Sequence, residues 1–527
     1  MTSLPRMQSS FHPLDWAIVA LYLAAMAAIG FYFSRRQTSL DRYLLADRSM
    51  GWLPVGLSLM AALNSGMDYL MQPSSTIRYG IVLAVGIVSW LPLYPWVARV
   101  AFPFYRRLHF YSVYEYLEAR FDVGVRTLAA VIFLLWRLGW MATAMYVPSL
   151  AINAATNGQV DLNTTTIVVG VVVTLYTMLG GIQAVIWNDV IQFFIMFGGL
   201  AATVAIAWAS VPGGFAEIFS SAAAAGKLDA WPPLTDPAAV GALAQVGSFL
   251  RQPMHVITLL VALIIGRMAQ YTTDQVMVQR LQTTRSVKEA RQAFAVNAGG
   301  DALWMIGLSF VGLALFAYFQ HHPLPAEYQT DKLLPYFMSI AFPIGAVGLV
   351  IAAIMAASLS SIDSAINACS SVAVVDLYNR LWRGRHAHES GSSAEDRHQV
   401  RAVRVATLIV GALGTTLACN VAAVGSLLEI NAKVVNAFTG PLFGIFLLAM
   451  FSERASSAAV LVSGVAGAVT SYYVAYHSAI GFLWPSTFGL VATLVAGSAL
   501  ALVLPMAEDD ERRALTWKSV MSRSELS

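Results

Sequence analysis

Charged residues are scarce in this chain of 527 residues: Asp, Glu, Lys and Arg make up 12% of it, against 57% hydrophobic residues. A soluble domain carries about a quarter charged residues, and its surface-to-volume ratio does not allow it to bury this much apolar surface. A polar block long enough for a separate soluble domain is also missing between Trp16 and Leu504. These absences predict an all-α polytopic membrane protein with a single domain over residues 1–527.

Cysteine is nearly absent as well. The two cysteines, Cys369 and Cys419, lie inside apolar stretches, where a thiol is a small buried hydrophobic group. This excludes a disulfide framework and a cysteine metal site. The sequence also lacks metal-ligand spacing, a nucleophile–base motif and a phosphate-binding loop. We therefore expect no enzyme activity and no organic cofactor, and an intramembrane enzyme is the weakest alternative.

Apolar stretches that can cross a bilayer recur along the whole chain. A spanning helix needs roughly 20 mostly apolar residues, and this rule predicts about 13 spans. The first apolar run, Trp16–Phe33, is too long for the core of a signal peptide, so we keep it as a helix. The spans are expected near residues 14–34, 52–77, 80–103, 123–156, 164–182, 185–210, 252–275, 290–319, 338–378, 398–420, 424–450, 455–477 and 483–506.

Lys and Arg gather in alternate connections, after the first, third, seventh and ninth spans; Arg35, Arg106, Arg280 and Arg380 are examples. Cytoplasmic loops of membrane proteins carry such an excess. The pattern predicts an inner (plasma) membrane protein with its N-terminus outside and its C-terminus in the cytoplasm. Because topology accounts for the basic residues, nucleic-acid binding has no support.

Three segments outside the spans have their own expected structure. The aromatic and charged stretch Tyr111–Phe121 is typical of a helix at the membrane interface. The polar stretch His386–His398 is expected to be a flexible cytoplasmic loop. The tail after Met506 is expected to be exposed to solvent.

Two spans contain interruptions. In the second span, "AALNSGMDYL" (residues 61–70) places three poor helix formers in succession before Asp68, and the seventh span contains "IIGRMAQYTTDQ" (residues 264–275). A broken helix exposes helix ends that can hold ions or charged solutes near the middle of the membrane. The breaks lie five spans apart, as an inverted five-plus-five repeat requires. The alternative is a pair of packing kinks.

The ninth span contains a serine cluster, "AASLSSIDSAINACSS" (residues 356–371). Ser360, Ser361 and Ser364 lie within about one helical turn, with Asp363 among them. Hydroxyl and free carbonyl oxygens suit a hard monovalent cation. The alternative is that the small serines only allow close helix packing.

From about Asp15 to Met450 the sequence resembles the sodium/solute symporter family, which includes sugar, proline, pantothenate and sialic acid carriers. The resemblance is carried by four landmarks in order: "LADRSMGWLPVGLSLMAA" (45–62), "LGGIQAVIWNDVIQFF" (179–194), "DQVMVQRLQTTRSVKEAR" (274–291) and "SLSSIDSAINACSSVAVVDLY" (358–378). Each landmark is loose alone, but four in this order and spacing are specific.

The resemblance implies the leucine-transporter fold. It implies an extra N-terminal helix (14–34), two inverted repeats (52–210 and 252–450), two extra C-terminal helices (455–506) and a cytoplasmic tail (507–527). It also implies sodium-coupled uptake of a small solute by alternating access. The shared sodium site falls on five residues: the carbonyls of Ala61, Asn64 and Ala357, and the hydroxyls of Ser360 and Ser361.

Some members of the family hold a second sodium with an aspartate that matches Asp189, and Asp363 could add a ligand. The alternative for Asp189 is a carboxylate at the cytoplasmic gate, which sodium passes on its way out.

The positions that bind solute in relatives fall on Asp68, Arg267, Asp301 and, in the fourth span, Arg137. Two arginines and two aspartates around one cavity would suit a zwitterionic or carboxylate-bearing solute, because Arg can clamp a carboxylate with two parallel hydrogen bonds. The alternative is that Arg267 only neutralises Asp301 or Asp68. Cavity walls or gates are expected from the aromatic residues Trp140, Tyr69 and Tyr271.

Two other functions remain open at this point. A proton-coupled or uncoupled carrier is conceivable because of the intramembrane carboxylates, although the serine pair favours sodium. A transporter-like solute sensor fused to a kinase would carry a long C-terminal signalling domain, and we do not expect one in the residues after Met506.

Overall fold

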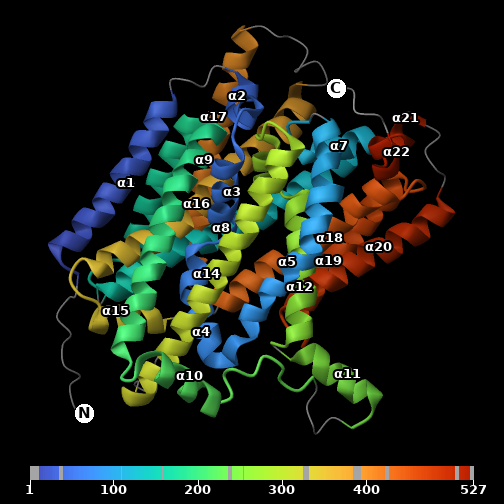
Figure 1. Cartoon of the computed structure of the whole chain (residues 1–527). Coiled ribbons are helices and arrows are strands. Elements are labelled where there is room, and N and C mark those ends of the chain that lie inside the picture. The colour runs from blue at the N-terminus through green and yellow to red at the C-terminus, as the bar shows by residue number, and fades with distance from the viewer. Residues whose placement is uncertain are drawn as a thin grey trace.

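The computed structural model describes residues 11–34, 39–108, 110–156, 158–234, 240–252, 254–323, 332–383, 393–421, 427–504 and 510–522. In this part of the chain all regular structure is helical, and the one β-bridge pairs Met50 with Thr284. The helices form a bundle in which most long axes run in one general direction (Figure 1). The expected all-α membrane architecture is confirmed.

The long helices of the bundle are α1 (Pro13–Ser34), α8 (Val123–Ala155), α9 (Leu162–Ser210), α12 (Val256–Thr273), α14 (Val287–His321), α16 (Ala346–Val372), α17 (Ser393–Ala418), α18 (Leu427–Phe451), α19 (Ser457–His477) and α20 (Pro485–Val503). The shorter ones are α2 (Leu40–Leu45), α3 (Trp52–Leu63), α4 (Gly66–Tyr79), α5 (Trp90–Pro95), α6 (Phe102–Leu108), α7 (Val113–Arg120), α10 (Gly214–Ala224), α11 (Ala242–Arg251), α13 (Gln275–Gln282), α15 (Leu333–Ala341), α21 (Asp510–Arg513) and α22 (Trp517–Ser522).

The described residues contain 11 helical segments long and apolar enough to cross a membrane. Two of them, Gly66–Leu108 and Leu162–Ser210, include a glycine with positive φ at which the chain turns: Gly80 (φ 72°) and Gly181 (φ 62°). Dividing the two segments at these glycines gives the 13 spans that hydropathy predicts. A left-handed backbone is open to glycine at low cost, so these two residues set the reversals.

Two spans are broken in mid-course, as the sequence predicts. The first break separates α3 from α4 at Asn64, whose backbone is extended (φ −99°, ψ 129°). The second separates α12 from α13 at Asp274 (φ −90°, ψ 115°). At both breaks a side chain caps the following helix: Ser65 accepts from the Met67 N–H, and Asp274 accepts from the Val276 N–H.

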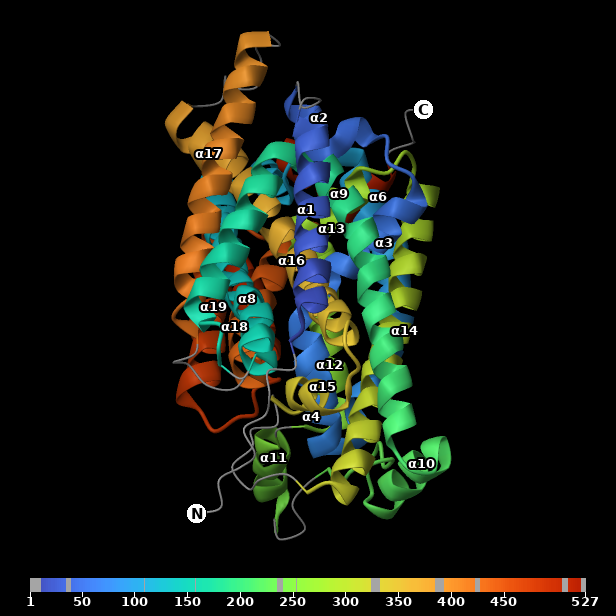
Figure 2. The ribbon, with the colours of Figure 1, turned by 90° about the vertical axis from the view of Figure 1, so that its left-hand side faces the viewer.

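Helix α16 lies at the centre of the bundle. In its apolar 18-residue stretch, 89% is buried inside the protein, which is the highest share among the candidate spans of the described chain. Helix α1 packs across α9 and α16 on the outside (Figure 2). Asp15 of α1 is fully buried there and accepts hydrogen bonds from the Gly345 N–H (3.1 Å) and the Gly348 N–H (2.7 Å) at the start of α16.

Four segments differ from the expectations. Helix α7 forms within Tyr111–Phe121, but Val113, Tyr114 and Leu117 are buried against neighbouring helices, so it is not a helix resting on the membrane surface. The predicted span 338–378 is interrupted between α15 and α16, because Pro343 cannot continue a helix. Residues 384–392 lie outside the described part of the chain.

The two remaining differences concern the polar segments. Residues 393–398 of the expected loop are helical and begin α17. The tail is not simply exposed, because α22 packs onto α6. Arg107 donates to the Met521 carbonyl (2.9 Å), Trp517 donates to the Val100 carbonyl (3.1 Å), and Val520 is buried.

Candidate functional site

The first helix break exposes carbonyl oxygens in the middle of the bundle. In a continuous helix the Ser65 N–H would donate to the Ala61 carbonyl, four residues earlier. Here it donates to Asp68 Oδ2 (2.7 Å) in a capping box at the start of α4. The last carbonyls of α3 therefore have no partner within their own helix, and they form its partially negative end.

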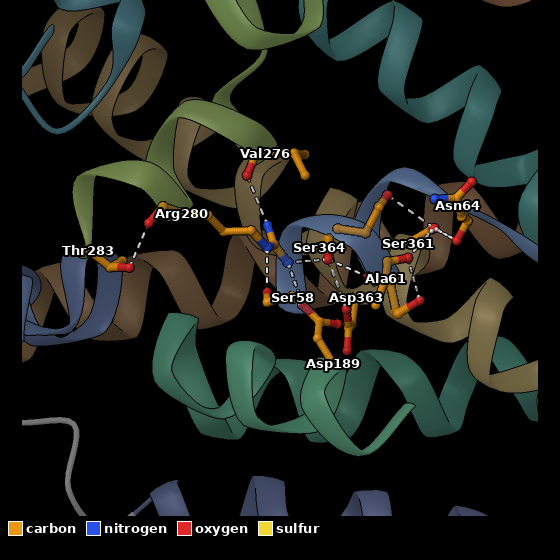
Figure 3. Close-up of polar contacts among 12 residues, drawn as sticks. Ser58, Ala61, Asn64, Asp189, Val276, Arg280, Thr283, Ser361, Asp363 and Ser364 are labelled. Carbon is orange, nitrogen blue, oxygen red and sulfur yellow. Dashed lines mark hydrogen bonds and ion pairs between the residues drawn. The ribbon is translucent and has the colours of Figure 1, made fainter. Parts of the chain in front are cut away.

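Two serines of α16 meet these carbonyls. Ser360 Oγ lies 2.9 Å from the Ala61 oxygen and 3.0 Å from the Ala357 oxygen. Ser361 Oγ lies 3.1 Å from the Asn64 oxygen (Figure 3). The fold thus brings together all five residues that the sequence nominates for sodium.

One further oxygen of this group was not predicted. The Ala62 carbonyl lies 3.2 Å from Ser361 Oγ. The group consists only of neutral oxygens, with no nitrogen or sulfur, and a negative helix end points at it. Hard cations prefer oxygen ligands.

The close approach of α4 to α16 depends on Gly66. A Cβ atom at this position would lie 2.2 Å from Ser358 Oγ and 2.7 Å from the Ile354 carbonyl oxygen. The backbone oxygen cannot move away without shifting α16. Only glycine lets the broken helix touch the serine-bearing helix here.

A second polar cluster lies beside the first. Asp189 of α9 and Asp363 of α16 are both fully buried and lie next to each other (Figure 3). Asp189 Oδ2 accepts from Ser58 Oγ (2.5 Å), and Asp363 Oδ2 accepts from the Tyr176 hydroxyl (3.1 Å). Asp189 Oδ1 has no hydrogen-bond partner among the described residues.

The cation of this cluster is Arg280 of α13, which is 1% exposed. Its Nη2 lies 2.9 Å from Asp189 Oδ2 and also contacts Ser364 Oγ. The sequence analysis counted Arg280 among the basic residues of a loop. No local pattern distinguishes it from Arg285 and Lys288, which are exposed. One arginine faces two carboxylates, which leaves room for one more positive charge.

A cavity of about 260 Å³ opens next to the first break. It is lined mainly by apolar side chains, among them Leu63, Met67, Met71, Leu259, Leu263 and Met305, and by the polar residues Asn64, Ser65, Gln72, Gln270 and Asn436. Its charged residues are Asp68, Arg267 and Asp301, and Trp140 also lines it. Four of the seven residues predicted for the solute site and its walls therefore share one cavity.

Within the cavity wall, Arg267 is already paired. Its Nη2 lies 2.7 Å from Asp301 Oδ2, and its Nη1 donates to Ser89 Oγ (3.1 Å). The guanidinium carbon lies 4.5 Å from the centre of the Trp90 ring, and Trp90 Nε1 donates to Asp301 Oδ2 (2.7 Å). Trp90 had not been predicted, because aromatic residues in spans serve most often as packing or interface anchors.

The other predicted residues do not line the cavity. Arg137 pairs with Asp274 at the second break, and its guanidinium lies 5.1 Å from the centre of the Trp140 ring. Tyr271 is buried and accepts a hydrogen bond from Asn297. Tyr69 is buried beside Thr203.

Comparisons with known proteins find similar membrane transporters. The model of the sodium:solute symporter family matches residues 43–467. The chain is 30% identical over 505 residues to the sodium/sialic acid symporter SiaT of Proteus mirabilis, covering 93% of this chain and 95% of that protein.

Two solved structures extend the likeness. One is a Na⁺-coupled sialic acid symporter in a substrate-bound, outward-open state; it is 29% identical, the match covers 95% of this chain and all of that one, and the TM-score is 0.83. The other is Mhp1, a transporter of the nucleobase-cation-symport-1 family. It is 14% identical, the match covers 91% of this chain and 99% of that one, and the TM-score is 0.54, so it supports the fold alone. The leucine-transporter fold is confirmed.

Proposed function

The chain belongs to the sodium:solute symporter family and is a sodium-coupled secondary transporter, and we propose that it takes up a small polar solute through the cavity beside the α3–α4 break. The contact between the free carbonyls of α3 and the hydroxyls of Ser360 and Ser361 carries the assignment of the sodium site. In this proposal sodium binds the carbonyls of Ala61, Asn64 and Ala357 and the two hydroxyls.

Sodium would act by joining two helices that have no covalent connection there. Its ligands come from α3, at a break, and from the central helix α16. The serine hydroxyls donate to the carbonyls across the same gap, and a bound ion would replace these bonds. Each sodium ion that moves inward releases roughly 2.3 kcal/mol of free energy per 100 mV of membrane potential. This free energy drives accumulation of the solute.

We propose a second cation site at Asp189 and Asp363. Two buried carboxylates facing one guanidinium leave one negative charge uncompensated, and such a charge is costly inside a membrane. The unpartnered Asp189 Oδ1 supports a further ligand at this point. A proton would satisfy the same charge balance as sodium, and this is the observation that favours the proton-coupled alternative.

The solute is proposed to bind Asp68, Arg267, Asp301 and Trp140, which line the cavity. Arg137 and Tyr271 would act from behind the wall, since Arg137 lies against Trp140. The related symporter of Proteus mirabilis carries sialic acid, as its name says. A zwitterionic or carboxylate-bearing solute would match that relative and the presence of Arg267.

We place the protein in the inner membrane with its N-terminus outside and its C-terminus in the cytoplasm. Helix α6, which carries Arg106 and Arg107, lies at the end of the bundle that holds α2 (Figure 2), whereas α10 and α11 lie at the opposite end (Figure 1). The positive-inside rule puts the basic end in the cytoplasm. The cavity is lined partly by Met254 and Leu483, which adjoin the outer end, so it would receive solute from outside.

The test is transient current from purified protein in proteoliposomes on a solid-supported membrane. A panel of amino acids, carboxylates, sugars and quaternary amines would be added in sodium and again in potassium. We expect positive current with one solute class, in sodium only. Current that persists in potassium and disappears when the pH gradient is collapsed would replace sodium coupling by proton coupling.

A further inference from the structure

We infer that the transported solute carries a positively charged nitrogen, and that this group binds the carboxylate of Asp68. The inference deepens the proposed function, because it concerns the same cavity and depends on that cavity being the solute site. It rests on the charges of the wall and on the hydrogen bonds that already occupy them.

Asp68 lines the cavity with a carboxylate that no other side chain binds. Its Oδ2 accepts from the Ser65 N–H at 2.7 Å and completes the cap of α4. Among the described residues, no side chain forms a hydrogen bond or an ion pair with this carboxylate. The side chain is only partly buried, as expected for a group at a cavity wall.

The other two charges of the wall neutralise each other. Arg267 and Asp301 form an ion pair at 2.7 Å, and Asp301 is further held by Trp90 Nε1 at the same distance. Both terminal nitrogens of Arg267 have partners, Asp301 and Ser89. The formal charges of the wall, −1 each for Asp68 and Asp301 and +1 for Arg267, therefore sum to −1.

No other cation compensates Asp68 within the described wall. Arg137, the second arginine nominated for a carboxylate, pairs with Asp274 outside the lining. The positive end of α4, which could attract a carboxylate, is already capped by Asp68 itself. A solute with only a carboxylate would therefore meet net repulsion, whereas an ammonium would restore neutrality.

The other lining residues indicate the chemistry of the rest of the solute. Met67, Met71, Leu259 and Leu263 provide apolar contacts, and the volume of about 260 Å³ fits a molecule of amino-acid size. The side-chain amides of Gln270 and Asn436 can bond a second polar end. The chemical class is thus an amine or amino acid with an apolar body.

Matched triplets of compounds test this directly. Each triplet consists of an amino acid, the acid that lacks its amino group and the amine that lacks its carboxylate. The first triplet is leucine, 4-methylpentanoate and 3-methylbutylamine, and the second is phenylalanine, 3-phenylpropanoate and 2-phenylethylamine. Proline and its corresponding analogues form the third. Binding to the purified full-length protein is measured by thermal stabilisation and calorimetry, in sodium and in potassium. In at least one triplet we expect the amine-bearing members to bind in sodium, and the deaminated acid to bind at least about 30-fold more weakly.

Two variants make the test specific to Asp68. Asp68→Asn removes the charge but keeps a carbonyl that can accept the Ser65 N–H, so the helix cap survives. Asp301→Asn removes the same charge from the same wall. We expect Asp68→Asn to abolish the preference for the amine, and Asp301→Asn to keep it and to improve binding of the deaminated acid by freeing Arg267.

Several outcomes would overturn the inference. They are equal binding of the deaminated acids, binding by none of the amine-bearing members, and an equal loss of amine preference in both variants. A deaminated acid that binds only in sodium would overturn the inference while supporting sodium coupling. If Asp68 binds sodium instead, Asp68→Asn would weaken sodium-induced stabilisation in the absence of any solute, which also contradicts the inference.

Discussion

Arg137 of α8 and Asp274, the residue at which the second broken span is interrupted, form an ion pair that is fully enclosed by protein. Arg137 is 3% exposed and Asp274 is not exposed at all. The Arg137 Nε also lies 3.3 Å from Asp274 Oδ1, and the same oxygen caps α13. The pair thus joins α8 to the break at which α12 ends and α13 begins.

This pair should contribute strongly to the stability of the folded protein. Arg137→Met keeps much of the packing between Trp136 and Trp140 but leaves Asp274 buried without a cation, which costs about 3–5 kcal/mol. We expect a clear fall in the melting temperature of the purified protein in sodium. The double variant Arg137→Met/Asp274→Asn removes both charges, keeps a side chain that can cap α13, and should recover a large part of the loss. A double variant less stable than the single one would contradict this account.

The serine hydroxyls should set sodium affinity without deciding the fold. Ser361→Ala removes one proposed ligand, and the loss of a polar contact to a charged group costs about 1.5–3 kcal/mol. We expect the sodium concentration for half-maximal uptake to rise about tenfold or more. Ser370→Ala is the matched control, because Ser370 lies on the same helix and bonds only the Ile366 carbonyl (2.6 Å). Equal sodium titrations of the two variants would remove Ser361 from the site.

Much of the fold could be predicted from the sequence because membrane helices follow local rules. Apolar stretches of sufficient length, the poor helix formers at Asn64–Gly66 and the arginine-rich connections are all local signals. The packing of α22 was not predictable in this way. A short amphipathic tail has no pattern that names its partner, and the contact of Trp517 with the Val100 carbonyl joins residues 417 positions apart.

For the site, the sequence indicated which residues carry polar groups but not which of them pair. The serines and helix ends near Ala61 could be matched by family spacing, and they do meet. Arg137 could not be assigned, since an arginine in a span can face a cavity or neutralise a buried carboxylate, and Arg280 was counted with a basic loop. Their partners Asp274 and Asp189 are distant in sequence. Pairing depends on side-chain positions that only the packed bundle defines.

The second cation site should be visible in the stoichiometry of transport. Asp363→Asn removes one of the two facing carboxylates but leaves the Asp189–Arg280 pair intact, so the protein should still fold. The remaining carboxylate is then neutralised by Arg280, and no charge is left for an additional cation. We expect the number of cations coupled to each solute to fall from about two to about one, measured from the reversal potential in proteoliposomes. An unchanged ratio would argue that Asp363 holds no transported cation.

The turn between the two arms of α9 offers a test of the fold itself. Gly181 has φ 62°, and a Cβ atom there would lie 3.0 Å from the Tyr43 carbonyl oxygen and 3.1 Å from its ring. Gly181→Ala should lower the free energy of unfolding by roughly 1–2 kcal/mol because of the left-handed backbone alone. The contact with α2 should lower it further. Gly198 lies in the second arm of the same helix, where an added Cβ meets no atom within 4 Å. Gly198→Ala should be neutral or stabilising by up to about 1 kcal/mol.

The two alanine variants should therefore shift the melting temperature in opposite directions, although they make the same chemical change in one helix. The reason is that alanine favours a regular helix at position 198, whereas the chain must leave the helical conformation at position 181. If the helix were continuous through residue 181, Gly181→Ala would raise the melting temperature instead of lowering it. A stabilised Gly181→Ala variant would therefore show that α9 crosses the bundle without turning. Thermal unfolding of both purified proteins, in the same detergent and in sodium, decides between these two courses of the chain.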